Sequence, residues 1–498
     1  MPAVTDIQDL VVIGGGINGV GIALDAAGRG LGVTLCEMGD LASATSSRSS
    51  KLAHGGLRYL EQGAFRLVRE ALDEREILLR NAPHISRPLR FRLPLNPALR
   101  PAWQIRAGLF LYDHLARRHR LPPSRALQFP PDGPLQADFH RGFEYADGWV
   151  DDARLVVLIA MAARRHGAEI LPRTRCIGAR RHNDLWQLTL QQGERRFERQ
   201  ARALVNAAGP WVSRLFPEVL HKSAPRPIRM VKGSHIVVPR IHPGDEAYIL
   251  QHDDGRIVFV IPYEDRFSLI GTTDVDYDGD PADAAISAAE IDYLLAVVNR
   301  YFRVQTAPGD LVWHYAGIRP LMAESSGSAQ SASRDYSLVL DAPAGAPPLL
   351  SVFGGKLTTY RRLAESACNR LRAFFPGAGP AWTRHAPLPG GDFEDLAIFE
   401  QALTRDYSWL PETLRHRFAR SYGTLSRQIL AGCENLDGLG ERLGADLYAG
   451  EADYLIQQEW ACCAEDILWR RSKLGLRFTP AEVARLEAWI ATRSAMPS

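Results

Sequence analysis

Short apolar runs alternate with amphipathic stretches along the first 80 residues. Residues 9–15 are a β-branched apolar run that ends in glycines, which predicts a strand followed by a tight turn. Residues 17–29 are small and mostly apolar and predict a helix, and residues 32–37 predict a second strand. Residues 64–80 place apolar side chains at helical spacing, so this helix buries one face. The order strand, glycine turn, helix, strand predicts a βαβ unit with a parallel sheet.

The middle of the chain changes to short strands separated by turn residues, which predicts a mostly antiparallel sheet. These strands are expected at residues 186–190, 236–238, 257–261 and 267–270. Residues 203–209 and 349–355 are apolar strands that end in glycine, as expected of buried strands that return to the parallel sheet. The fold class is therefore α/β with an α+β insert: a Rossmann-like domain interwoven with an antiparallel-sheet domain.

The last hundred residues follow a linker and read as helical. Residues 374–392 hold four prolines and four glycines, which is typical of a linker. We expect three domains. Their ranges are 1–80, 150–215 and 315–375 for a discontinuous nucleotide-binding domain, 81–149 and 216–314 for a substrate and membrane-facing domain, and 390–498 for a C-terminal helical domain.

Composition narrows the classes of function. The chain has 498 residues and a formal net charge of +2, so no overall field favours nucleic acid as a partner. None of the six cysteines forms a CxxC pair, so no metal site is expected and a reducing, cytoplasmic compartment is the simplest interpretation. The N-terminus lacks signal-peptide features, and the longest uncharged apolar stretch, residues 10–24, is too short to span a bilayer.

A glycine-rich turn follows the first predicted strand. Gly14, Gly16 and Gly19 have the spacing of a dinucleotide fingerprint, in which glycines allow a tight turn, close approach to a pyrophosphate and helix packing. Glu37 ends the next strand, where an acid can accept hydrogen bonds from ribose hydroxyls. The helix N-terminus then faces the pyrophosphate. The fingerprint alone does not separate NAD from FAD.

Longer motifs identify a family. The segment TSSRSSKLAHGGLRYL at residues 45–60 occurs with GGGING, GFEYADGWVDDARL, AAGPW, KGSH, GTTD and FGGKLTTYR in this order. Together they resemble the flavin-dependent glycerol-3-phosphate dehydrogenases of the aerobic bacterial type, over residues 9 to about 489. The resemblance implies a D-amino-acid-oxidase-like fold, noncovalent FAD, and oxidation of sn-glycerol 3-phosphate to dihydroxyacetone phosphate. It also implies electron transfer to a membrane quinone and a peripheral position on the cytoplasmic face of the inner membrane. A homodimer is one expected form of the protein.

Oxidation of a secondary alcohol by flavin transfers a hydride from C2 to flavin N5 and removes the hydroxyl proton, so a base is needed near C2. His54 and His235 are the main candidates, a lysine is a further alternative, and the sequence does not choose among them.

A phosphate dianion requires fixed cations, which favours arginine and lysine. We expect the substrate to contact Arg58, Tyr59, Thr272, Arg319, Arg334 and Lys356, with Arg319 and Lys356 also serving catalysis. The family resemblance adds a larger set of FAD-contacting residues. These are Gly14, Gly15, Gly16, Asn18, Gly19, Glu37, Ser46, Ser47, Lys51, Leu52, His54, Gly56, Leu57, Ala208, Gly209, Trp211, Gly317, Gly355, Lys356, Leu357 and Thr358.

The segment 99–125 is locally basic. It contains six arginines and one aspartate, interleaved with bulky apolar residues, a composition suited to an anionic membrane surface. A core helix with a solvated basic end is the alternative, because apolar residues occupy more than one helical face.

Three other functions remain open. An amino-acid or 2-hydroxy-acid oxidase of the same fold would bind a carboxylate with Arg319, and a noncatalytic FAD-binding protein would keep the site without turnover. An NAD-dependent dehydrogenase fits less well, because only one glycine fingerprint occurs and no second βαβ half follows residue 60.

Overall fold

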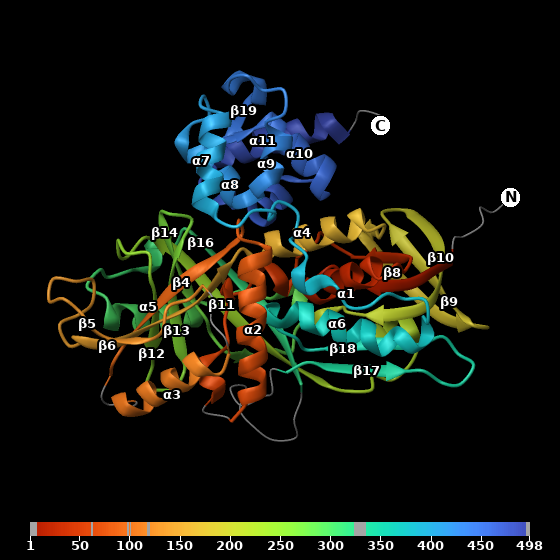
Figure 1. Cartoon of the computed structure of the whole chain (residues 1–498), viewed down its shortest axis with the longest axis horizontal. Helices are drawn as coiled ribbons and strands as arrows, with labels where there is room; N and C mark the ends of the chain where they lie inside the picture. The colour runs from red at the N-terminus through yellow and green to blue at the C-terminus, as the bar shows by residue number, and fades with distance from the viewer. Residues whose placement is uncertain are drawn as a thin grey trace.

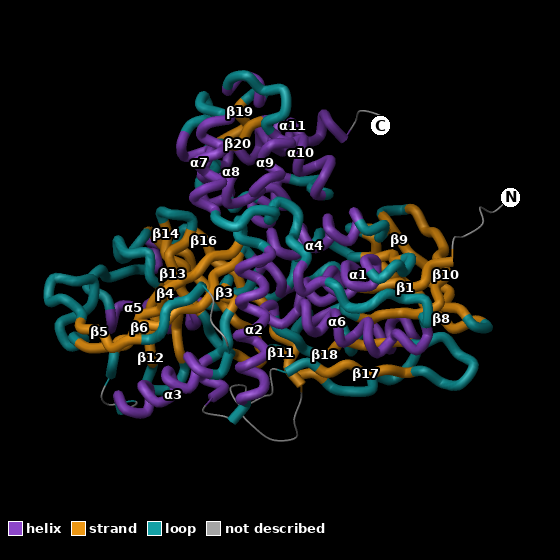
Figure 2. Tube along the Cα trace, viewed as in Figure 1, coloured by secondary structure: helices purple, strands orange, loops and turns teal. Residues whose placement is uncertain are grey.

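The computed structural model describes residues 7–60, 63–96, 99, 101–116, 120–322 and 335–494. Two sheets lie side by side, and the C-terminal residues form a separate helical layer above the region where the sheets meet (Figure 1). Figure 2 shows helices gathered around the first sheet and in the C-terminal layer. The part of the molecule that contains the second sheet consists mainly of strands. The predicted fold class is confirmed.

The first sheet is mainly parallel and has the strand order β17-β18-β10-β1-β2-β7. These strands are β1 (Ile7–Ile13), β2 (Val33–Cys36), β7 (Glu169–Leu171), β10 (Arg195–Asn206), β17 (Ser337–Asp341) and β18 (Leu349–Phe353), and β8 (Thr174–His182) with β9 (Leu185–Gln192) extends β10 as an antiparallel meander. Helices α1 (Ile17–Gly28), α4 (Asp152–Arg165) and α6 (Tyr360–Leu371) pack together over it. β1 lies between β2 and β10, so the glycine turn after β1 sits at the centre of the sheet.

The second sheet is mostly antiparallel, with the order β15-β11-β14-β13-β12-β4-β6-β3 and with β16 paired to β11. Its strands are β3 (Leu52–Ala53), β4 (Ser86–Pro94), β5 (Arg125–Gln128), β6 (Arg141–Val150), β11 (Ile228–Pro239), β12 (Ala247–Gln251), β13 (Ile257–Tyr263), β14 (Phe267–Gly271), β15 (Val275–Asp276) and β16 (Trp313–Met322). Helices α2 (Phe65–Asn81), α3 (Ala102–His114) and α5 (Ala288–Tyr301) accompany it. β3 and β16 belong to this sheet although both lie within ranges expected for the nucleotide-binding domain, so the domain boundaries stay predictions.

The C-terminal domain is mainly helical, as expected. It contains α7 (Leu396–Asp406), α8 (Glu412–Tyr422), α9 (Ser426–Ile429), α10 (Ala449–Glu459) and α11 (Pro480–Ser494), with a small hairpin of β19 (Arg442–Gly444) and β20 (Leu447–Tyr448) that the helical pattern did not predict. Arg154 of α4 and Glu459 of α10 form a fully buried ion pair that joins this domain to the first sheet's helices. Within the residues described, no helix has the length and apolarity needed to cross a bilayer.

Candidate active site

The turn between β1 and α1 requires its glycines. Gly14 has a φ of +113°, and a Cβ there would lie 2.5 Å from the carbonyl oxygen of Ala207. A Cβ on Gly19 would lie 1.8 Å from the carbonyl oxygen of Gly14, which leaves no room for any side chain. These two positions of the turn therefore accept only glycine, because a side chain would collide with the backbone packed against it.

The carboxylate of Glu37 lies beside this turn. Its Oε2 accepts a hydrogen bond from the N–H of Gly15 at 2.6 Å, and its Oε1 accepts one from Gly39 at 2.8 Å. Burial raises the pKa of Glu37, and the two N–H groups act in the opposite direction. Glu37 thus ties the glycine turn to the end of β2 and lines the cavity described next.

A cavity of about 180 Å³ surrounds the glycine turn. Its walls include many residues of the predicted cofactor set: Gly14, Gly16, Asn18, Glu37, Ser46, Ala208, Gly209, Trp211 and Gly355. Ser46 accepts a hydrogen bond from the N–H of Ile17 at 3.0 Å, and the side-chain amide of Asn18 donates to the carbonyl of Gly354 at 3.1 Å.

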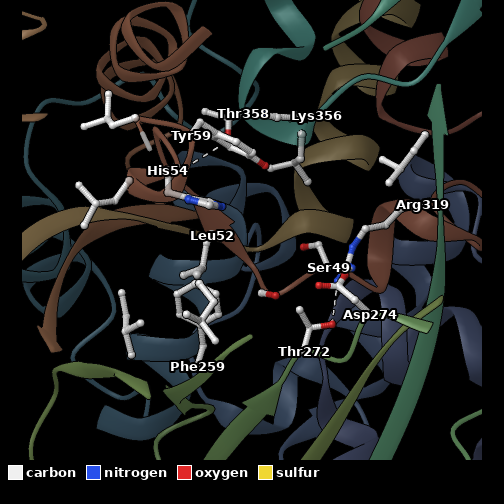
Figure 3. A pocket seen from close by; sticks show the side chains of 18 of the residues that line it. Ser49, Leu52, His54, Tyr59, Phe259, Thr272, Asp274, Arg319, Lys356 and Thr358 are labelled. Atoms are coloured by element: carbon white, nitrogen blue, oxygen red, sulfur yellow. Dashed lines mark hydrogen bonds and ion pairs between the residues drawn. The ribbon is translucent and has the colours of Figure 1, made fainter. Parts of the chain in front are cut away.

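A larger cavity of about 360 Å³ lies between the two sheets (Figure 3). It shares Thr45, Pro320, Gly354 and Gly355 with the smaller cavity, so the two cavities adjoin one another. The predicted site residues on its wall are Leu52, His54, Gly56, Leu57, Tyr59, Thr272, Arg319, Gly355, Lys356, Leu357 and Thr358.

Arg319 projects from β16 into the larger cavity and lies beside Thr272 and Asp274 (Figure 3). Its Nη2 donates to Thr272 Oγ1 at 2.7 Å, and its Nη1 forms an ion pair with the carboxylate of Asp274. These contacts hold the planar guanidinium group in one orientation at the cavity wall.

Lys356 and Tyr59 meet on another side of the same cavity (Figure 3). The Lys356 ammonium lies 3.8 Å from the centroid of the Tyr59 ring, which is a cation–π contact. Two cations from distant parts of the chain, Arg319 and Lys356, therefore face one cavity.

The two candidate bases occupy different positions. His54 lines the cavity, and its backbone N–H donates to Thr358 Oγ1 at 3.3 Å. His235 is 1% exposed and lies one layer behind the wall, where its Nε2 is 2.8 Å from Ser50 Oγ. The ring of His235 stacks on Tyr315 with 4.8 Å between centroids.

The surroundings of His235 disfavour a bound proton. Burial lowers the pKa of His235 well below its ordinary value, and the charges of Arg319 and Lys51 act in the same direction. His235 contacts the hydroxyl group of Ser50 from behind the wall, while His54 is the histidine that reaches the cavity.

Comparison with known proteins explains this arrangement. Residues 9–361 match the family described as FAD dependent oxidoreductase, and residues 381–492 match the C-terminal domain of alpha-glycerophosphate oxidase. The chain belongs to the FAD-dependent oxidoreductase family. The resemblance found in the motifs and the FAD cofactor are thereby confirmed.

Full-length relatives refine the position of the chain within this oxidoreductase family. It is 57% identical to glycerol-3-phosphate dehydrogenase of Pseudomonas aeruginosa over 97% of this chain and 95% of that protein. It is 52% identical to aerobic glycerol-3-phosphate dehydrogenase of Escherichia coli and 50% identical to D-erythritol 1-phosphate dehydrogenase of Brucella abortus, in both cases over 97% of each chain.

Solved structures agree with the fold of these oxidoreductases. Glycerol-3-phosphate dehydrogenase from Bacillus halodurans, complexed with FAD, has a TM-score of 0.76 and 28% identity over 98% of this chain and 91% of that chain. Glycine oxidase from Geobacillus kaustophilus has a TM-score of 0.55 and 19% identity over 74% of this chain and 98% of that chain, a likeness in fold alone.

The residues present fit FAD. The two cavities adjoin one another, and Gly14 and Gly16 of the glycine turn line the smaller one. Asn18 Oδ1 is buried there and accepts no hydrogen bond from the part of the chain that the structure describes. Such an atom is expected to find its partner in a bound ligand.

Several predicted residues lie elsewhere. Lys51 lines neither cavity, because its ammonium is buried against Asp152 at 2.8 Å instead of facing a diphosphate. The other predicted site residues that line neither cavity are Gly15, Gly19, Ser47, Gly317 and His235. Arg334 and the side chain of Arg58 are outside the described residues.

Other residues of the site were missed from the sequence. Asp274 is the last residue of the motif GTTD, of which only Thr272 was predicted to contact the substrate. Ser49, Ser50, Tyr145, Gln251 and Phe259 also line the larger cavity. Ser49 and Ser50 fall inside the long motif at residues 45–60, which was the available signal, whereas Phe259 appeared only as part of an apolar strand.

Proposed function

We propose that the protein catalyses the FAD-dependent oxidation of sn-glycerol 3-phosphate to dihydroxyacetone phosphate. The observation that carries this proposal is the placement of two cations, Arg319 and Lys356, around the cavity that His54 lines. Two separated cations suit a substrate with both a phosphate group and a reacting hydroxyl group better than one with a single carboxylate. The names of the P. aeruginosa and E. coli relatives point to the same substrate.

When bound, FAD supplies the acceptor, at its N5 atom, for the hydride that leaves C2 of the substrate. The chain's own residues then provide the acid–base and binding chemistry. We assign the removal of the C2 hydroxyl proton to a ring nitrogen of His54, because this imidazole lies on the cavity wall. His235 stays neutral and keeps the Ser50 hydroxyl in place.

The two cations have separate tasks in this proposal. Arg319, fixed by Thr272 and Asp274, stabilises negative charge that develops on the C2 oxygen as its proton leaves. Lys356, beside the Tyr59 ring, binds the phosphate as a point charge. Arg58 and Arg334 remain proposed phosphate ligands on the family resemblance.

D-erythritol 1-phosphate is a second candidate substrate. A dehydrogenase named for it is 50% identical to this chain over the full length of both proteins, close to the value for the E. coli glycerol-3-phosphate enzyme. The two polyol phosphates share the phosphate and the secondary alcohol, so the proposed roles of Arg319, Lys356 and His54 apply to either.

An anaerobic visible spectrum of the purified protein tests the assignment. We expect flavin bands near about 450 nm that bleach on addition of sn-glycerol 3-phosphate, with D-erythritol 1-phosphate, D-alanine and L-lactate as comparisons. Faster bleaching by D-erythritol 1-phosphate than by sn-glycerol 3-phosphate would favour the second candidate. Bleaching by an amino or hydroxy acid alone would instead support an oxidase, and a flavin that no substrate reduces would support a noncatalytic protein.

We also propose that the electrons pass to a membrane quinone while α3 rests on an anionic bilayer at the cytoplasmic face of the inner membrane. Trp103 is 73% exposed and Phe110 is 64% exposed, and both lie on the outward side of α3, opposite the buried Ile105 and Leu109. α3 lies at the end of the molecule opposite the C-terminal domain (Figure 1). Exposed aromatic side chains beside arginines favour an anionic membrane interface.

Flotation with phosphatidylglycerol-containing vesicles tests the membrane proposal. The double variant Trp103→Ser/Phe110→Ser should lose most of its binding, whereas Ile398→Ser, which removes a 66% exposed apolar side chain from α7, should bind like the wild type. Pure phosphatidylcholine vesicles should bind weakly, because the electrostatic attraction is absent. Equal binding by the wild type and the double variant would remove α3 from the interface.

A further inference from the structure

An aromatic stack joins the C-terminal domain to the active site. Trp469 of the C-terminal domain stacks on Trp313 of β16, with 4.1 Å between ring centroids and 19° between planes. Trp313 contacts Tyr315 at 5.0 Å, and Tyr315 stacks on His235 at 4.8 Å. Four rings thus form a continuous path from the C-terminal domain to the histidine behind the cavity wall.

The stack acts on the strand that carries Arg319. Side chains two residues apart on a strand point to the same face, so Trp313, Tyr315 and Arg319 share one face of β16. Tyr315 lies opposite His235 in the pairing of β16 with β11, and its hydroxyl donates to the carbonyl of Ser49 at 2.7 Å. A displacement of Trp313 is therefore passed to both the arginine and the serine segment of the cavity wall.

A second link runs through charged groups. Lys473 of the C-terminal domain contacts both carboxylate oxygens of Asp151, at 2.8 and 2.9 Å. The adjacent Asp152 binds Lys51 at 2.8 Å and accepts a hydrogen bond from Ser49 Oγ at 2.7 Å. Both links, aromatic and ionic, converge on residues 49–51, of which Ser49 and Ser50 line the cavity.

The C-terminal domain also contributes a side chain to the apolar core beside the second sheet. Leu476 is 9% exposed and packs in the same apolar cluster as Phe259 and Tyr145, two residues of the cavity wall. The match to the FAD dependent oxidoreductase family ends at residue 361, so this domain lies outside the part of the chain that defines the flavoprotein fold. Its contacts with the cavity wall are an addition to that fold.

We propose that Trp469 and Lys473 are positioning residues, through which the C-terminal domain holds Arg319 and the Ser49–Lys51 segment in their working arrangement. This inference rests on the proposed function, because its effect appears in reduction of the flavin by substrate. A shift of about 1 Å in such groups lowers a rate by up to about 100-fold. The domain is thus part of what sets the turnover rate, although it supplies no group to the cavity wall among the residues described.

The rate of flavin reduction by sn-glycerol 3-phosphate in the purified holoprotein tests the proposal. Trp469→Leu should lower the rate at saturating substrate at least about tenfold, and Trp469→Phe, which keeps a ring for stacking, should restore it to within about threefold of the wild type. Trp409→Leu is the matched control, because Trp409 is a half-buried tryptophan of the same domain that contacts Tyr407 and not β16. It should leave the rate within about threefold of the wild type.

A second variant moves Trp469 without deleting it. A Cβ on Gly475 would lie 2.5 Å from the Trp469 ring, so Gly475→Ala should displace the ring and slow reduction in the same way. This variant keeps the test valid if Trp469→Leu does not fold. Lys473→Met should slow reduction as well, while Lys473→Arg should preserve it.

The variants also separate positioning from general stability. Each is measured well below its own melting temperature and at equal flavin content, so a purely structural effect disappears from the rate. Equal rates for Trp469→Leu, Gly475→Ala and Trp409→Leu would overturn the proposal, as would equal losses in Trp469→Leu and Trp469→Phe. A wild-type protein that sn-glycerol 3-phosphate does not reduce would overturn the proposed function itself, and the wild-type control reports that failure separately.

Discussion

Asp152 and Lys51 form an ion pair that is completely removed from solvent, with 2.8 Å between Oδ1 and Nζ and side-chain exposures of 0% and 1%. Burial opposes the charged form of the lysine, but Asp152, Tyr315 and Asp151 together outweigh it and raise the pKa of Lys51. Asp152→Asn would leave a buried ammonium without its counter-charge. We expect a loss of about 3–5 kcal/mol in the free energy of unfolding, measured by denaturant titration of the holoprotein.

Asp253→Asn is the control for this loss. Asp253 pairs with Arg300 at 2.9 Å, but its side chain is 62% exposed, so its removal should cost about 0–1 kcal/mol. Similar losses in both variants would show that Asp152 and Lys51 contribute no more than a surface pair.

The two histidines should differ in their effect on turnover. His54→Gln removes the imidazole on the cavity wall, and we expect flavin reduction by sn-glycerol 3-phosphate to slow about 100-fold or more. His235→Gln keeps a polar partner for Ser50 and should slow reduction less than about tenfold. Stopped-flow reduction measures both rates, and a reversed order would assign the proton to His235.

Arg319→Ala should weaken productive substrate binding. Loss of one charge-assisted contact costs about 1.5–3 kcal/mol, which lowers kcat/KM about 10- to 150-fold. Arg229→Ala on the neighbouring β11 removes an arginine whose partner Asp276 is exposed, and it should leave kcat/KM nearly unchanged. Steady-state kinetics of the two variants compare them directly, and equal kinetics would place Arg319 outside the reaction.

Gly19→Ala should abolish flavin binding. The added Cβ would lie 1.8 Å from the Gly14 carbonyl oxygen, so the turn must open and lose its shape. The ratio of flavin to protein absorbance after purification measures the loss, which we expect to be nearly complete. Gly309→Ala has no heavy atom within 4 Å of the new Cβ and should keep its flavin.

The buried His84 should make the free energy of unfolding depend on pH. Burial, with the charge of Arg154, lowers the pKa of His84 to about 3. At pH 5 the unfolded chain binds a proton at this residue and the native protein does not, so stability falls as the pH falls. Between pH 7 and pH 5 this group should remove about 2 kcal/mol of unfolding free energy.

His84→Gln should lose this part of the pH dependence. Its denaturation midpoints at pH 7 and pH 5 should differ less than those of the wild type. The exposed His140→Gln serves as the control and should keep the wild-type slope. An unchanged slope in His84→Gln would mean that other groups account for the acid sensitivity.

Local features of the fold were predictable because their signals lie close together in the sequence. The glycine turn is expected at residues 14–19, and the structure has it between β1 and α1. The pairing of Lys51 with Asp152 was not predictable, since the partners are 101 residues apart and meet only in the tertiary structure. For the same reason Lys51 was expected to contact the cofactor, although it lines neither cavity.

The placement of β1 has a consequence for synthesis on the ribosome. Leu10 of β1 pairs with Ala203 of β10. One edge of β1 is therefore unpaired until the ribosome has added roughly 190 more residues. At about 5–20 residues per second, this strand stays half-paired for roughly 10–40 s. Its side chains Leu10, Val11 and Val12 are fully buried in the finished protein. Until β10 is made, β1 has only β2 as a pairing partner in the sheet, and its other edge is unpaired.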